Sequence, residues 1–92
     1  MSEHYDDAGF VLSSEYRVTV LHELSKAPAT PSAMADRSGH AIAHISRTLG
    51  KLRERGLVDL LVSEDRRKGR IYGLTDYGRE VLDTLDEMEA RA

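Results

Sequence analysis

The sequence predicts a small, mainly helical domain with one β-hairpin, in the order of three helices, two strands and a last helix. Three observations predict this fold class. Apolar residues recur at helical spacing in several segments, two short apolar runs flank a polar stretch that contains one glycine, and the chain has only 92 residues. A chain of that length is expected to form a single domain.

Two helices open the predicted domain. The first spans about residues 14–26, where Ser13 or Ser14 can cap its start and three apolar residues share one face. The second runs from Thr30 to about residue 37, because threonine is a favourable cap and the proline after it fits the first helical position. Ser38-Gly39 breaks this helix, so a short turn leads to the next one.

The third predicted helix spans about residues 40–55 and ends at Gly56, which can adopt the left-handed conformation of a helix C-cap. The face opposite its apolar stripe carries small, polar and cationic residues, with no acidic residue before Glu54. The stripe that we expect to be buried consists of Ile42, Ile45, Leu49 and Leu52.

The apolar runs at 57–62 and 71–74 predict a hairpin whose tip is the polar segment between them. A third short strand is expected near Ala29. Thr75 caps the last helix, which reaches about residue 90 and whose apolar stripe could complete the core or form a dimer seam. Since a core of this size is small, we favour a homodimer. The tentative dimer interface is Val81, Leu82, Leu85 and Met88.

Residues 1–12 show no clear periodicity, and we interpret them as an N-terminal arm that docks on a single domain at 13–92. Within that domain the helix pair occupies about 30–55, the hairpin about 57–74 and the last helix about 75–90. Phe10, Val11 and Leu12 are the apolar residues through which the arm would dock.

Charge is unevenly distributed along the chain, although the net charge is only −3. Residues 37–72 hold nine basic and four acidic residues, whereas the segments before and after each hold two basic and six acidic residues. A basic middle between acidic flanks indicates a polyanionic partner.

Several classes of function lack support in the sequence. The chain contains no cysteine, so a disulfide framework and a thiolate metal site are excluded. No apolar run approaches the ~20 residues that span a bilayer, and no signal peptide is recognisable, so we expect a cytoplasmic protein without a membrane partner. No catalytic motif, cofactor motif or metal site is found; His40 and His44 have metal-ligand spacing but no third ligand nearby. We therefore expect neither an enzyme nor a bound cofactor.

A short helix, a Ser-Gly turn and a longer helix have the spacing of a helix-turn-helix, whose second helix lies in the major groove of DNA. Arg47 is the best candidate for reading a base, because its guanidinium can bind guanine O6 and N7 together. Ala43 allows close approach, and His44 can donate to a base or a phosphate. Phosphate contacts are expected from Thr30, Ser32, His40, Ser46 and Lys51.

The predicted hairpin tip is strongly basic, with four cations in five residues. A tip of this kind can follow the DNA backbone or enter the minor groove. Such contacts add salt-dependent affinity and little sequence information. The residues are Arg66, Arg67, Lys68 and Arg70.

Two runs carry a resemblance to a known family: Ser46-Arg47 with Leu49, Leu52 and Gly56-Leu57-Val58, and Tyr72 with Leu74-Thr75 and Gly78. Over residues 14–85 the chain resembles winged helix-turn-helix transcription regulators of the MarR/ArsR type, and is most similar to small archaeal members. The resemblance implies that Ser46 and Arg47 lie in the recognition helix and that Arg66–Arg70 form the wing. The chain lacks the longer flanking helices of MarR proteins and the cysteine metal sites of ArsR sensors, so any small-molecule effector stays unknown.

The sequence thus predicts a winged-helix regulator that binds double-stranded DNA as a homodimer. Repression by occluding a promoter is the mechanism that we favour. The alternative is a winged-helix module that binds another protein of the transcription machinery. Such a module would show an exposed apolar patch in place of the basic face.

Overall fold

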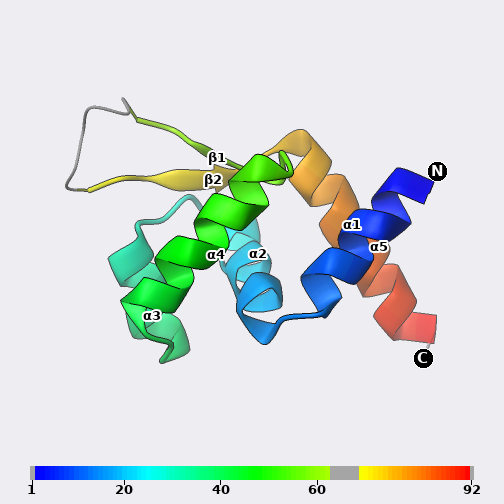
Figure 1. Ribbon diagram of the computed structural model, residues 1–92, viewed down its shortest axis with the longest axis horizontal. Coiled ribbons are helices and arrows are strands. Elements are labelled where there is room, and N and C mark those ends of the chain that lie inside the picture. Colours follow the sequence, from blue (N-terminus) through cyan, green and yellow to red (C-terminus); the bar gives the residue numbers. More distant parts are fainter. Residues whose placement is uncertain (1, 63–68, 92) are drawn as a thin grey trace.

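The computed structural model describes residues 2–62 and 69–91. In this part of the chain α1 and α5 lie side by side at one end of the molecule, and α3 and the hairpin lie at the other (Figure 1). The elements are α1 (Ser2–Leu12), α2 (Glu15–Lys26), α3 (Pro31–Ser38), α4 (Ile42–Glu54), β1 (Val58–Leu60), β2 (Tyr72–Leu74) and α5 (Asp76–Arg91).

The mainly helical fold with a two-stranded hairpin confirms the predicted fold class, and the capping residues explain where its helices begin and end. The Thr30 hydroxyl accepts a hydrogen bond from the Ala33 N–H at 3.1 Å and so caps α3. Gly39 and Gly56 have φ of 80° and 76°, the left-handed conformation in which glycine carries no steric cost. Ser14 stands at the N-cap of α2, but its side chain makes no capping hydrogen bond.

The strands pair antiparallel with Val58 opposite Leu74 and Leu60 opposite Tyr72. The third strand predicted near Ala29 is present as an isolated bridge. Ala29 and Tyr72 exchange two backbone hydrogen bonds, of 3.0 and 2.9 Å. This bridge ties the segment that leads into α3 to the base of the hairpin.

The first correction concerns residues 1–12, which we interpreted as an arm. Residues 2–12 form helix α1, and its Ala8 and Val11 are fully buried in the core. α1 packs on α5 and on α2, so it is part of the folded domain. Its apolar positions are few, and Gly9 interrupts them, which explains why periodicity alone does not reveal the helix.

The apolar stripe on α5 is buried within the chain. Val81 and Leu85 have no exposed surface and Leu82 is 5% exposed, while Met88 packs partly buried against the same core. α1 covers this face of α5 within the single chain. These four residues therefore help to complete the core of the monomer, which is one of the two roles that the sequence allowed for this stripe.

The second correction concerns Ile42, which we expected in the buried stripe of α4. Ile45, Leu49 and Leu52 are fully buried, but Ile42 is 50% exposed. The helix begins at Ile42 rather than at residue 40, so this side chain lies on the first turn, at the edge of the core.

No helix in the described ranges is long and apolar enough to span a membrane.

Candidate nucleic-acid interface

The outward face of α4 is the surface that the sequence singled out. Ala43, Arg47, Gly50 and Lys51 are all exposed, whereas the residues behind them hold the helix to the core. Helical spacing places these four on one side, with Glu54 following on the same side at the end of the helix. The face thus combines two cations with two residues small enough to let another molecule approach the helix backbone.

An open groove runs beside this face, between the helix-turn-helix and the hairpin. Its walls come from the start of α3, the flank of α4 and the base of the hairpin, where Gly69 and Arg70 precede β2. A groove between two elements that both carry basic residues suits an extended anionic strand. The lining residues are Thr30, Pro31, Ser32, Ile42, Ser46, Gly50, Arg53, Gly69, Arg70 and Tyr72.

The groove brings together four of the predicted phosphate-contacting residues from three separate elements. Ser32 is exposed and Thr30 is half-buried at the start of α3, Ser46 is exposed on α4, and Arg70 is half-buried beside the hairpin. The Thr30 hydroxyl already accepts the capping bond from Ala33, so its oxygen is partly committed to the helix. Ser32, in the first turn of α3, is the more open hydroxyl at that helix start.

The rings of His40 and His44 pack against Tyr16 of α2, a contact that the sequence did not indicate. The His44 ring stacks on the Tyr16 ring of α2, with centroids 4.9 Å apart and an interplanar angle of 13°. The His40 ring meets the same tyrosine edge-on, with centroids 4.6 Å apart. The two histidines therefore sit around one aromatic ring at the α2 side of α4, away from the flank that faces the hairpin.

The groove also contains residues that sequence reasoning missed. Ile42 was assigned to the core, and neither Arg53 nor Tyr72 was predicted to contact DNA. Arg53 follows Ser46 by seven residues, two helical turns, so helical spacing could have placed it on the same flank. Its Nε lies 3.8 Å from an Asp59 carboxylate oxygen, which tethers the guanidinium near β1. Arg66, Arg67 and Lys68 lie outside the described residues.

The family model named HVO_A0261 N-terminal domain matches residues 5–92. The chain belongs to this family. The match begins within α1, in agreement with the packing of that helix against the domain. No curated protein matches this sequence.

Solved structures of transcription regulators share the fold of this HVO_A0261-type domain. The regulator BldR from Sulfolobus solfataricus aligns with a TM-score of 0.77 at 24% identity, over 98% of this chain and 66% of its own. NMB1585, a MarR-family regulator from Neisseria meningitidis, aligns at 0.72 and 20% identity, over 85% and 56%. A mutant of ZitR from Lactococcus lactis aligns at 0.73 and 17%, over 85% and 53%. The resemblance to the MarR type is thereby confirmed at the level of the fold, and the chain spans roughly half to two thirds of these structures.

Proposed function

We propose that this domain binds double-stranded DNA and regulates transcription, with α4 in the major groove. The observation that carries the proposal is the exposed cationic face of α4 beside an open groove shared with the basic hairpin. The similar structures named MarR-family regulators support it, since they have the same fold. Nothing in the proposal needs a cofactor.

In this proposal Arg47 reads a base in the major groove of DNA. The protein groove between α4 and the hairpin holds the sugar-phosphate backbone that lies between the major and minor grooves of the DNA. A guanidinium on an exposed helix face can bind guanine in bidentate fashion. Ser32, Ser46 and Arg70 then contact the strand as it passes between α4 and the hairpin. The hairpin cations Arg66, Arg67 and Lys68 continue this contact along the flanking backbone or into the minor groove.

His40 and His44 take a smaller part in this proposal than Arg47 does. Their rings contact Tyr16 at the α2 side of α4, so they lie at the border of the proposed interface. Ring edges carry the N–H groups, which suit a phosphate at the border of the interface. Thr30 and Lys51 complete the phosphate contacts, and Ala43 gives room for a thymine methyl.

We also propose that the protein acts as a homodimer and represses by occupying a promoter. A dimer would set two α4 helices about 34–36 Å apart, one turn of DNA. The stripe on α5 is buried in the monomer, so the seam must use another surface. Light scattering on the purified protein, alone and with a selected DNA site, measures this stoichiometry directly.

The first experiment is a titration of the purified chain against random duplex DNA at several salt concentrations, followed by selection of an enriched site. We expect affinity to fall steeply with salt, because phosphate contacts release counterions. Replacing Arg66, Arg67 and Lys68 together by alanine should weaken binding to all sequences. It should also reduce the log–log salt slope by about 0.9 for each phosphate that the variant no longer neutralises.

A control for the loss of a single positive charge is Arg79→Ala, on the exposed side of α5. An unchanged slope in the triple variant would place the hairpin off the phosphates. Absence of binding by a folded protein, over the whole salt range, would contradict DNA binding itself and favour the protein-binding alternative.

A further inference from the structure

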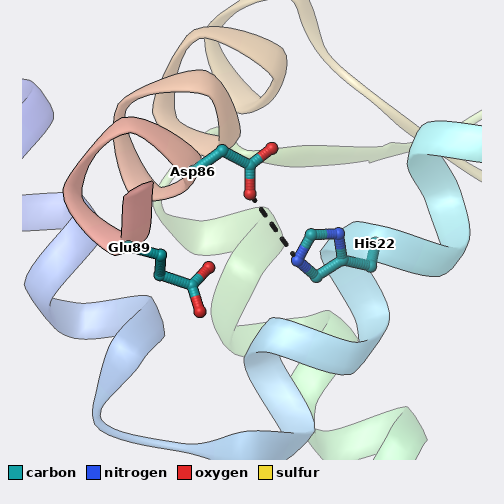
Figure 2. Close-up of side chains that lie close together, drawn as sticks. All are labelled: His22, Asp86 and Glu89. Carbon is teal, nitrogen blue, oxygen red and sulfur yellow. Dashed lines mark ion pairs between the residues drawn. The ribbon is translucent and has the colours of Figure 1, made fainter. Parts of the chain in front are cut away.

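A second cluster of chemically active side chains lies between α2 and α5, away from α4 and the hairpin. His22 of α2 faces two carboxylates of α5, Asp86 and Glu89 (Figure 2). One ligand atom from each of the three lies within 4.8 Å of the other two, and His22 Nε2 is 3.9 Å from an Asp86 oxygen. Three groups able to hold a metal thus converge from two helices.

The packing of the two helices fixes the backbone of this cluster. Asp86 and Glu89 are three residues apart, so they project from the same face of α5. Each helix also sends a fully buried leucine into the core directly beside the cluster: Leu21 precedes His22, and Leu85 precedes Asp86. The distance between the ligands is therefore set by the core, and only the side-chain torsions remain to be adjusted.

We propose that His22, Asp86 and Glu89 bind a divalent transition-metal ion, with Zn²⁺ as the best fit. Zinc accepts imidazole nitrogen and carboxylate oxygen, and sites with three protein ligands complete their coordination with water. Magnesium and calcium prefer oxygen ligands alone, so the imidazole disfavours them. The side chains of His22 and Asp86 are 43% and 53% exposed, which leaves room for the water.

The adjustment needed to hold zinc is small. Bonds of about 2.1 Å in a tetrahedral site put neighbouring ligand atoms roughly 3.4 Å apart. The present separation of up to 4.8 Å closes when exposed side chains rotate, with no movement of the helices. The charge of α5 favours a cation, because besides Asp86 and Glu89 the helix holds four acidic and two basic residues. A bound ion would cross-link α5 to α2 and stabilise the fold.

The test uses the purified, tag-free chain and zinc alone. Calorimetric titration should show one Zn²⁺ per chain with a Kd in the micromolar range. Thermal denaturation with zinc at about 100 times Kd should raise the midpoint by roughly 10 °C, because a ligand that binds only the folded state stabilises it. His22→Gln and Asp86→Asn should each weaken zinc binding at least tenfold and abolish most of this rise.

Two exposed acidic residues of the same helix supply matched controls. Asp83→Asn and Glu87→Gln remove the same charge as Asp86→Asn and Glu89→Gln, and should change zinc affinity less than twofold. Circular dichroism of each variant shows that the surface substitutions leave the fold intact. Co²⁺ in place of zinc should give visible absorption bands that the His22→Gln variant lacks.

The proposal is overturned if zinc neither binds stoichiometrically nor raises the midpoint. Equal affinity in the wild type and the His22→Gln variant would overturn it as well. A specific competitor is the His40–His44 pair, which has metal-ligand spacing on α4. Loss of zinc binding in His44→Gln, with retention in His22→Gln, would move the metal to that pair and refute the α2–α5 site.

Discussion

The α1–α5 end of the molecule and the outward face of α4 use their charged residues in opposite ways. At the α1 end, Asp7 accepts a hydrogen bond from Arg55 at 2.8 Å and another from the Tyr77 hydroxyl. The Phe10 ring lies between the guanidinium groups of Arg17 and Arg55, 3.8 and 3.9 Å from its centre. On α4, Arg47 and Lys51 instead extend into solvent. One end uses its charges within the fold, and the other presents them outward.

The two regions are nevertheless connected through Arg55. This residue is the C-cap of α4, and its side chain reaches back to Asp7 and Phe10 of α1. α1 therefore fixes the end of the helix whose middle carries Arg47. A helix remote from the proposed interface can thus set the orientation of the residues in it.

The largest effect on stability is expected from Gly78→Ala, at the junction of α5 and β1. A Cβ at this position would lie 2.0 Å from the Leu57 carbonyl oxygen. That oxygen also accepts the Thr75 N–H at 3.1 Å, so it cannot simply move aside. We expect a loss of about 3 kcal/mol of unfolding free energy, the upper part of the range for overpacking, measured by urea denaturation. Gly9→Ala, which meets no atom within 4 Å, is the control and should not destabilise.

Asp7→Ala tests the charged contacts at the α1–α5 end of the molecule directly. The change removes the acceptor of two hydrogen bonds and leaves the partly buried Tyr77 hydroxyl and the Arg55 guanidinium without it. Hydrogen bonds to a charged group contribute about 1.5–3 kcal/mol, so the unfolding free energy should fall by about 2 kcal/mol. The exposed neighbour supplies the comparison, since Asp6→Ala should change stability by less than about 0.5 kcal/mol. Equal stabilities of the two variants would show that the Asp7 contacts add nothing.

Arg47→Ala tests the outward-facing region, and its effect should appear in binding and not in folding. We expect affinity for the preferred DNA site to fall by about 2 kcal/mol, with relaxed discrimination at one base pair. Stability should stay within about 0.5 kcal/mol, as for other exposed substitutions. Equal losses on the preferred site and on random DNA would refute base reading. Arg79→Ala on α5 controls for the removal of one positive charge.

Gly50→Ala should change the stability of the fold and the affinity for DNA in opposite directions. A methyl group here meets no atom within 4 Å, and alanine is favoured over glycine in a helix by about 1 kcal/mol. Stability should therefore rise by up to about 1 kcal/mol, while DNA affinity should fall because the added methyl keeps α4 further from the duplex. A rise in both quantities would mean that DNA does not approach the helix at this position.

Local signals predicted most of the fold. Thr30 and Thr75 occupy the predicted N-caps, and Gly56, with its left-handed φ, directly follows Arg55, the C-cap of α4. Ile45, Leu49 and Leu52 are buried as their spacing requires. α1 escaped prediction because its stability comes from packing on α5, a contact between the two ends of the chain. Ile42 was misplaced because the exact start of α4 decides whether its first apolar residue reaches the core.

The shared face of α4 could be predicted from the sequence because a single helix carries it. The spacing of Ala43, Arg47 and Lys51 defines their shared face without any tertiary information. The stacking of His44 on Tyr16 joins residues 28 positions apart, and His22 meets Asp86 across 64 positions. Such pairs depend on how helices cross, which sequence periodicity does not encode.

The bridge between Ala29 and Tyr72 has a consequence for how a protein of this kind can change its target. The bridge is made by main-chain atoms alone, and it joins the approach to α3 with the base of the hairpin. Exchange of side chains on the surface of α4 leaves this connection intact. In the proposed mode of DNA binding, a duplicated copy can therefore acquire a new preferred sequence one residue at a time, while the connection between the approach to α3 and the hairpin is inherited unchanged.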